Sequence, residues 1–385
     1  MSKDDPLILD YEPLIFLRCH SKTDTDTADV RTKVWQVIFN PNGSNTIATC
    51  GGNKVCIIDL SSQKVRQRYS AEIKEILFAL MWFSKNGNDI LITGGDLGVL
   101  YFINLESKNQ VAHFTVPKSK SKIFSLTLYP SRDNAFFCAM STGEIYLVDA
   151  DLERRSSPKI DIVASFSCKG EITRTAFCSY SSTLFAATST GLYGWSTALQ
   201  NYEEWNDKII TFNLQMDGNL KSEDKIVDSI EMIEDEFMAL KYALDSFIYI
   251  WHVELSVAGV QHETRIIDIV PFYKLVWCET DNYYMEISAN YDLGLLTCGD
   301  AHGKIWLYDI RFLRTHDHEA SVKTKTIKAF NILDWPPIDD IYHAKSKKLS
   351  LETDDIVIQK AVVSPDGKYC VAITDRNTVC LWSQI

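Results

Sequence analysis

The sequence has 385 residues, with 39 Lys or Arg against 51 Asp or Glu, so the formal net charge is −12. This acidic balance argues against direct binding of nucleic acid by this domain, because phosphate backbones are held by clustered Lys and Arg. The sequence shows neither a charged-then-apolar leader nor a run of about 18 apolar residues, which argues against secretion and against membrane spanning.

A pattern of strand, tight turn and strand returns seven times along the chain. It is clearest in Gly299 to Ile310, GDAHGKIWLYDI, whose second strand ends on Tyr308-Asp309, close to the Trp-Asp dipeptide of a WD repeat. The position of Asp309 is filled in the other copies by Asp59, Asn104, Asp149, Ser196, His252 and Ser383. The shortest spacing, from 59 to 104, is close to the roughly 40 to 45 residues of a four-stranded blade. The later copies are more widely spaced, so we expect loop insertions there, at residues 311–325 and 336–355.

These repeats predict an all-β fold, a seven-bladed WD40 β-propeller in one domain covering residues 1–385. In chain order the blades are expected near residues 33–70, 75–116, 122–167, 172–215, 225–272, 283–333 and 357–385 plus 14–20. The outer strand of blade four is expected near Ile209 to Leu214, that of blade five in RIIDIVPF (residues 265–272), and that of blade six around Ile327 to Leu333.

The N-terminal apolar segment, Leu14 to Leu17, has no partner strand nearby in the sequence. The seventh copy ends at Ile385, directly after its third strand, Thr378 to Trp382, and so lacks a fourth. We therefore expect the N-terminal strand to complete blade seven, because this pairing closes the ring and covers an otherwise open sheet edge.

The 10 cysteines are scattered, with no CxxC and no paired ligand spacing. Several of them, such as Cys50, Cys56 and Cys298, fall inside apolar strand segments. This distribution predicts reduced thiols in the core of an intracellular protein.

Two short segments resemble chemical motifs, and both have a simpler interpretation. Gly299 to Lys304, GDAHGK, lacks one residue of the GxxxxGK[ST] phosphate loop and leads into a strand, which favours a blade turn. His316-Asp317-His318-Glu319 carries metal-ligand side chains, but it lies in a polar loop without Cys or a further His at ligand spacing. No nucleophile elbow marks a catalytic site, so we expect no enzyme, no bound metal and no cofactor.

Aromatic residues begin several of the predicted first strands, where the blades converge on the central channel. Aligned four residues before Phe39, this position holds Trp35, Phe78, Phe124, Thr173, Asp228, Tyr284 and Gln359. We predict that Trp35, Phe78 and Tyr284, with Tyr283 as a supporting wall, form an aromatic cage for a methylated ammonium group, which binds the negative faces of aromatic rings. The alternative is that these rings only plug the channel.

Several segments resemble a known family. YEPLIFLRCHSK (Tyr11 to Lys22), TCGGNKVCIID, CGDAHGKIWLYDI, ILDWP and ITDRNTVCLW resemble the C-terminal propeller of the leucine-rich repeat and WD repeat-containing protein 1 family. The resemblance spans almost the whole chain, whereas the leucine-rich repeats of that family are absent from it. It implies a nuclear protein of heterochromatin that associates with the origin recognition complex and reads methylated histone tails.

The same first strands are similar to the Polycomb propeller called embryonic ectoderm development protein, whose aromatics form a trimethyl-lysine cage. The match lies at Trp35 in KVWQVIFN, at Phe78 in ILFALMW, and at Tyr283 and Tyr284 in NYYMEIS. The resemblance implies a reader of a methylated histone H3 tail peptide. The alternative function is a pure protein-interaction scaffold with a plugged channel.

Overall fold

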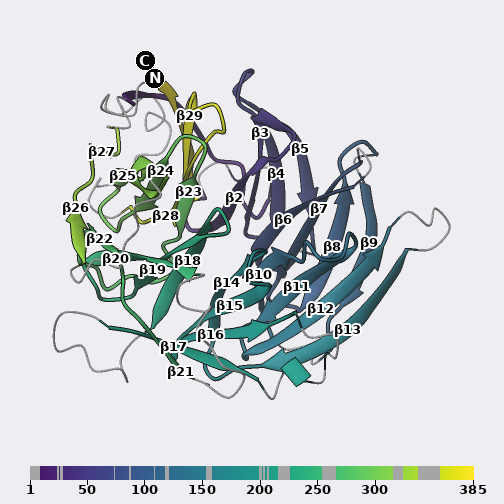
Figure 1. The fold of residues 1–385 in the computed structure, drawn as a ribbon. Coiled ribbons are helices and arrows are strands. Elements are labelled where there is room, and N and C mark those ends of the chain that lie inside the picture. Colours follow the sequence, from purple (N-terminus) through teal and green to yellow (C-terminus); the bar gives the residue numbers. More distant parts are fainter. Residues whose placement is uncertain are drawn as a thin grey trace.

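The computed structural model describes residues 9–385 except 24–25, 27–28, 73, 86–87, 108, 118–120, 153–157, 199–201, 203, 206–207, 216–225, 254–265, 315–323 and 337–355. Its strands form seven separate sheets that stand around a central axis like blades (Figure 1). Within each sheet the first strand is innermost. Each first strand contacts the first strand of the next blade, and β28 contacts β2, so the ring is closed. The predicted seven-bladed β-propeller is therefore confirmed.

The first three blades are regular four-stranded antiparallel sheets. Blade one contains β2 (Val34–Asn40), β3 (Gly43–Gly51), β4 (Lys54–Asp59) and β5 (Lys64–Ser70). Blade two contains β6 (Leu77–Lys85), β7 (Asn88–Gly95), β8 (Val99–Asn104) and β9 (Asn109–Thr115). Blade three contains β10 (Ile123–Leu128), β11 (Ala135–Met140), β12 (Glu144–Asp151) and β13 (Lys159–Ser167).

The remaining blades are less regular. Blade four contains β14 (Ile172–Cys178), β15 (Thr183–Thr188), β16 (Gly191–Ser196), β17 (Ile210–Leu214) and β21 (Ile266–Ile269). Blade five contains β18 (Val227–Ile233), β19 (Phe237–Tyr242), β20 (Phe247–His252), β22 (Tyr273–Val276) and β26 (Lys325–Ile327). Blade six contains β23 (Ile287–Asn290), β24 (Leu295–Gly299), β25 (Ile305–Asp309) and β27 (Asn331–Leu333), with the short 3-10 helix η2 (Arg311–Arg314) after β25. Blade seven contains β28 (Ile358–Val363), β29 (Tyr369–Thr374), β30 (Val379–Gln384) and β1 (Tyr11–Leu17).

The N-terminal strand completes blade seven, as predicted. β1 pairs antiparallel with β30, from Tyr11 opposite Gln384 to Leu17 opposite Val379. The start of the described chain and its C-terminus consequently lie beside each other, with Ile385 N donating to Asp10 O at 3.0 Å (Figure 1). The pairing gives β30 a partner for backbone groups that would otherwise form an open edge.

Two blades carry a fifth strand donated by the next stretch of chain. β21 pairs in parallel with β17 at the edge of blade four, and β26 pairs in parallel with β22 at the edge of blade five. The prediction that residues 265–272 form the outer strand of blade five is therefore wrong, because β22 takes that place. Of the segment expected around Ile327 to Leu333, the end of β26 belongs to blade five and β27 to blade six.

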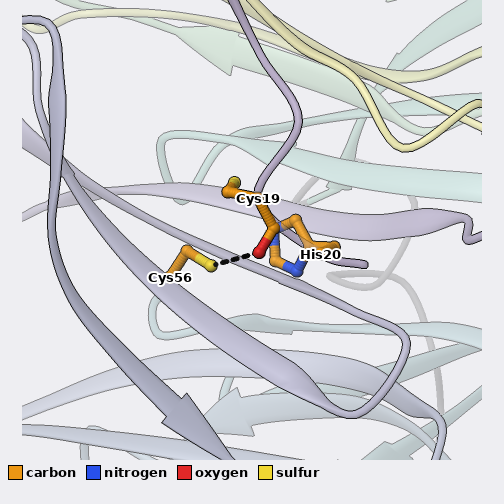
Figure 2. A group of neighbouring side chains, drawn as sticks. All are labelled: Cys19, His20 and Cys56. Carbon is orange, nitrogen blue, oxygen red and sulfur yellow. Dashed lines mark hydrogen bonds between the residues drawn. The ribbon is translucent and has the colours of Figure 1, made fainter. Parts of the chain in front are cut away.

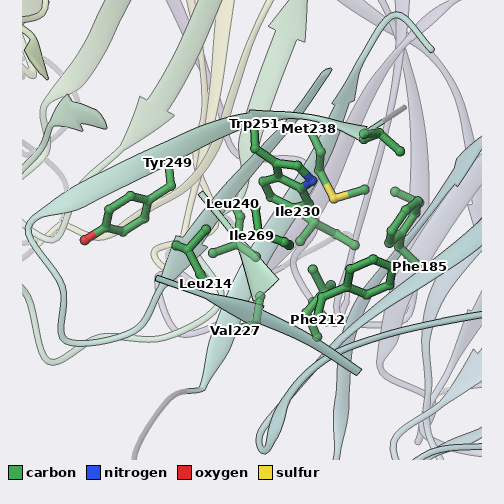
Figure 3. Close-up of a cluster of buried hydrophobic side chains, with 14 of the residues drawn as sticks. Phe185, Phe212, Leu214, Val227, Ile230, Met238, Leu240, Tyr249, Trp251 and Ile269 are labelled. Atoms are coloured by element: carbon green, nitrogen blue, oxygen red, sulfur yellow. The ribbon is translucent and has the colours of Figure 1, made fainter. Parts of the chain in front are cut away.

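The donated strand β21 contributes to the core between blades four and five. Ile267 and Ile269 are buried there with Phe212, Leu240 and Trp251, whereas Ile266 is 58% exposed. Figure 3 shows Ile269 beside Leu214 and Leu240 in this cluster. The alternating burial of β21 thus follows from one face lying on the core and the other facing solvent.

The structure also bears on the predictions about the cysteines and about membrane spanning. All ten cysteines are free thiols, and eight of them are buried. In the part of the chain that the structure describes, no helix is long and apolar enough to cross a membrane.

Candidate functional site at the channel mouth

Most of the innermost strands begin with a β-bulge, which leaves one residue outside the regular pairing with the second strand. The pairing shifts between Val34 and Gln36 in β2, and equivalent shifts occur in β6 at Phe78 and in β10 at Phe124. A bulged residue is left without a ladder partner, which frees its side chain to point elsewhere. The first strands of blades four, five and seven have the same shift, and their bulged residues are Thr173, Asp228 and Gln359. The sequence alignment identified this structural position correctly in six blades.

In blade six the alignment was wrong by one residue. Leu295 faces Asp309 as Thr46 faces Asp59, so Ile287, opposite Cys298, corresponds to Val37, opposite Thr49. Glu286 is then the counterpart of Gln36, and Met285, not Tyr284, takes the position of Trp35. Tyr284 comes from the connecting segment before β23. Its backbone has a positive φ of 65°, which turns the chain at this point.

Four aromatic rings nevertheless form a closed cycle. Ring centroids are 5.1 Å apart for Trp35 and Phe78, and 5.1 Å for Phe78 and Phe124. The cycle closes through Phe124 and Tyr284 at 5.8 Å and through Tyr284 and Trp35 at 6.0 Å. The centre of a square with such sides lies about 4 Å from each centroid, within the roughly 6 Å reach of a cation–π contact. We call Trp35, Phe78, Phe124 and Tyr284 the aromatic ring site.

The structure thus brings together three of the four predicted cage residues. Trp35, Phe78 and Tyr284 are in the cycle, and Phe124 takes the place expected for Tyr283. Tyr283 is 40% exposed and is absent from the ring contacts found among the described residues. The prediction left Phe124 out of the cage, although Phe124 shares the sequence position of Trp35 and Phe78, and that shared position was the signal that could have identified it.

A buried ion pair fixes the backbone of Tyr284. Its N–H donates to Asp228 Oδ1 at 2.5 Å, and the other oxygen of Asp228 accepts from Lys241 Nζ. The side chains of Asp228 and Lys241 are both fully buried, and Lys241 Nζ lies 4.6 Å from the ring centroid of Trp277. Burial, with the nearby carboxylates of Glu171 and Asp228, raises the pKa of the Tyr284 phenol, so it remains neutral at physiological pH.

Two lysines of the chain itself lie against the aromatic ring site. Lys33 Nζ is 5.4 Å from the ring centroid of Trp35. Lys122 Nζ is 5.9 Å from Phe78 and 6.0 Å from Phe124. These distances are close to the outer limit of a cation–π contact, so ammonium groups of the chain itself already lie near three of the four rings.

The channel beside the aromatic ring site contains a charged cluster. Glu286 Oε2 lies 3.1 Å from Arg174 Nη1 and 3.1 Å from Lys360 Nζ. Gln36 donates to Glu286 and accepts from Lys360 Nζ at 3.1 Å. Burial alone would raise the pKa of the Glu286 carboxyl, but Arg174 and Lys360 outweigh it and hold that pKa below its ordinary value. This cluster fills part of the channel and leaves a cavity of ≈ 430 Å³ lined by Arg174, Glu231 and Lys360.

A separate group of potential metal ligands lies in blade one, where sequence spacing gave no sign of it. Cys19, His20 and Cys56 are buried, with one ligand atom of each within 4.8 Å of the others (Figure 2). His20 Nδ1 donates to Gly51 O at 3.1 Å, so Nε2 accepts from Thr49 Oγ1 at 2.8 Å. The Cys56 thiol donates to Cys19 O at 3.2 Å, and burial raises its pKa well above the ordinary value. Both imidazole nitrogens and the Cys56 thiol are therefore engaged, and the group packs the end of the N-terminal segment onto blade one.

The two weaker motif candidates have different outcomes. In residues 299–304 the Asp300 carboxylate accepts from His302 N at 2.8 Å and Lys304 N at 2.9 Å, and Gly303 has a φ of 76°. This segment is the turn between β24 and β25, as expected. His316 to Glu319 lie outside the described residues.

The strands, the ring closure and the repeat spacing define a class: this chain is a WD-repeat β-propeller, a fold that serves as a platform for protein interactions. The chain belongs to the family of leucine-rich repeat and WD repeat-containing protein 1, because the model of that family's WD domain matches residues 5–385.

Individual relatives agree with this assignment. The chain is 26% identical over 404 residues to leucine-rich repeat and WD repeat-containing protein 1 of Xenopus laevis, covering 96% of this chain and 52% of the relative. The Danio rerio protein of that name is 27% identical, with 97% and 50% covered, and the Homo sapiens protein is 24% identical, with 97% and 58% covered. The chain thus spans about half the length of the curated relatives it matches.

Proposed function

We propose that this propeller is a chromatin reader that binds a methylated lysine of a histone H3 tail in the aromatic ring site. The observation that carries the proposal is the closed cycle of Trp35, Phe78, Phe124 and Tyr284 at the start of the innermost strands. Aromatic faces attract quaternary ammonium groups, which are weakly hydrated and cannot form a salt bridge through an N–H. Because the centroids are close together, the rings move outward by a fraction of an ångström to admit the methyl groups.

We propose further that the domain associates with subunits of the origin recognition complex in the nucleus, on heterochromatin. Family membership and the interaction-platform fold support this part of the proposal. The test is co-sedimentation of the purified propeller with purified origin recognition complex. Association at micromolar concentration supports the proposal, and its absence while methylated peptide still binds confines the function to histone reading.

The reader function is tested with histone H3 peptides that carry unmodified, mono-, di- or trimethylated lysine. The substitutions Trp35→Ala, Phe124→Ala and Tyr284→Ala each remove one ring, and each is expected to weaken binding of the trimethylated peptide by roughly tenfold or more, since a desolvated cation–π contact contributes about 2 kcal/mol. Tyr283→Ala is the matched control, because Tyr283 is adjacent in sequence but outside the cycle. Binding is measured by fluorescence polarisation, with circular dichroism to verify folding.

A second candidate function is a scaffold whose channel is permanently plugged. The edge contacts of the rings and the Glu286 cluster favour it. Equal affinity of the wild-type protein for methylated and unmodified peptides, or unchanged binding in all three ring variants, would establish the scaffold and remove the reader.

A further inference from the structure

A second pocket lies close to the aromatic ring site, between blades one and two. Its volume is ≈ 540 Å³ and it is lined by the end of β5, by the loop after it, by the β7–β8 turn and by β9. The Leu77–Gly95 pairing places that turn beside the start of β6. Phe78 of the aromatic ring site follows Leu77 directly, so the pocket and the site share the face on which the innermost strands begin.

Two tyrosines from different blades form the walls of this pocket. Tyr69 of β5 and Tyr101 of β8 have ring centroids 6.0 Å apart and planes inclined by 50°. Tyr69 Oη donates to Gln110 Oε1 at 2.6 Å, and Tyr101 Oη donates to Glu75 Oε2 at 3.3 Å. These hydrogen bonds fix both rings, leaving an aromatic cleft that opens beside Leu97.

Three carboxylates lie in or beside this pocket. Glu72 lines it together with His113, whereas Glu75 is only 1% exposed and accepts from Leu97 N at 3.2 Å. Asp96 accepts from Ile76 N at 2.8 Å. Neither Lys nor Arg is among the lining residues, and within the described part of the chain none of these three carboxylates is in an ion pair. The pocket therefore combines aromatic faces with the exposed carboxylate of Glu72, the two features that bind an organic cation.

We propose that this pocket binds the guanidinium group of an arginine that lies two to four residues from the methylated lysine in the same peptide. The inference rests on the proposed reader function and extends it to a two-point recognition of basic peptides. A guanidinium is planar, stacks on aromatic rings and offers five N–H donors to carboxylates. A lysine ammonium has neither the planar shape nor the donor arrangement, so it binds more weakly here.

The separation of the two sites agrees with this spacing. Tyr101 lies opposite Thr93, and Thr93 lies opposite Leu80 of β6, so Tyr101 is two strands, or about 10 Å, from the innermost strand of blade two. An extended peptide rises about 3.3 Å per residue, and its side chains alternate between two faces. A residue two to four positions away thus reaches the pocket while the lysine occupies the ring site.

The test uses a peptide with trimethyl-lysine at a fixed position in a Gly/Ser background, and one arginine placed in turn at each of the flanking positions. Affinity is measured by fluorescence polarisation. We expect about a tenfold gain at one position in the stated window, on the scale of a cation–π contact with a charge-assisted hydrogen bond. Citrulline at that position, which is nearly isosteric but neutral, loses the gain, and lysine retains only part of it.

Protein variants assign the gain to the pocket. Tyr69→Ala and Glu72→Gln both abolish the arginine gain while preference for the methylated over the unmodified peptide persists. Glu72 is exposed, so its substitution leaves the fold intact even where Tyr69→Ala destabilises it. Phe124→Ala gives the reverse result, with methyl preference lost and the arginine gain retained. Tyr180→Ala, at a tyrosine that is 66% exposed, is the control and changes neither.

A direct probe separates failure of this inference from failure of the reader function. N-acetyl-arginine methylamide, at millimolar concentration, is titrated into protein carrying ¹³C-labelled tyrosine. Shifts of the Tyr69 and Tyr101 ring signals, with Tyr180 unchanged, support the pocket even if no peptide shows methyl preference. The proposal is overturned if these two signals do not move, if no arginine position improves affinity, or if the gain survives in both pocket variants.

Discussion

Asp228 connects the stability of the fold to the geometry of the aromatic ring site. Its carboxylate neutralises Lys241 in a fully buried pair and accepts the N–H of Tyr284. Asp228→Asn leaves Lys241 buried without a counter-charge, which is expected to lower the free energy of unfolding by about 3–5 kcal/mol. Chemical denaturation measures this loss. The double variant Asp228→Asn, Lys241→Met is expected to recover part of it, and a double variant less stable than the single one would contradict the ion-pair argument.

Glu75 is expected to make stability depend on pH. Burial, assisted by Asp96 and Glu72, raises the pKa of the Glu75 carboxyl to about 7, whereas the unfolded chain has the ordinary value near 4.5. Between these values the folded state holds more protons than the unfolded state, so this contribution to stability is full below about pH 4.5 and is lost as the pH rises through 7.

The variant Glu75→Gln isolates this effect because glutamine keeps the carbonyl acceptor but does not ionise. We expect the melting temperature of the variant to exceed that of the wild type at pH 8 and the difference to shrink at pH 5. Thermal melts at both pH values test it. A difference that is the same at both would show that the Glu75 carboxyl is not protonated preferentially in the folded state.

The sequence predicted the position of a site residue correctly where that position is fixed by the local strand pattern. Trp35, Phe78 and Phe124 share one bulge position, so a single alignment placed all three in one column, but only Trp35 and Phe78 of them were predicted to belong to the cage. Tyr284 was identified with an incorrect alignment, because the turn at its positive φ is not encoded by a glycine. Cys19, His20 and Cys56 could not be linked from sequence, since the contacts that join them cross more than 30 residues, as in the 37-residue separation of Cys56 and Cys19.

At the scale of elements, the repeat gave the inner three strands of every blade but not the outer edges of blades four to six. Inner strands pair with their neighbours in sequence through short turns, so local periodicity predicts them. β21 and β26 instead pair in parallel with strands that are separated from them by long connections. The residue pattern of such a segment indicates a strand but does not predict which strand it pairs with. Residues 266–269 were thus recognised as a strand and assigned to the wrong blade.

The assignment of β21 to blade four can be tested by two neighbouring isoleucines. Ile269 is 1% exposed in the core between blades four and five, and Ile266 is 58% exposed. Ile269→Ala is expected to lower the free energy of unfolding by about 2–4 kcal/mol through lost burial and a cavity. Ile266→Ala, the matched control, is expected to change it by less than about 0.5 kcal/mol. Equal effects of the two substitutions in chemical denaturation would contradict the pairing.

At the scale of the whole molecule, the ring is closed by a strand from the opposite end of the chain. β1 pairs with β30, and the segment that follows it is held on both sides of the closure. His20 N donates to Asn377 Oδ1 at 3.0 Å in blade seven, while the His20 imidazole contacts Thr49 and Gly51 in blade one. The N-terminal segment therefore joins the last blade to the first, and the propeller depends on it.

Deletion of residues 1–22 should expose the edge of β30 and remove the contacts of His20. We expect a large fall in melting temperature and self-association, since an open strand edge pairs with other chains. Size-exclusion chromatography and thermal melts measure both. A synthetic peptide of residues 9–22 added in trans should restore a monomer with a higher melting temperature, because it supplies the missing strand together with His20. The same peptide with Ile15→Asp and Leu17→Asp is the control, since both side chains pack against the core of blades seven and one. A truncated protein that remains monomeric and melts at the wild-type temperature, or equal rescue by both peptides, would show that the ring does not depend on this strand.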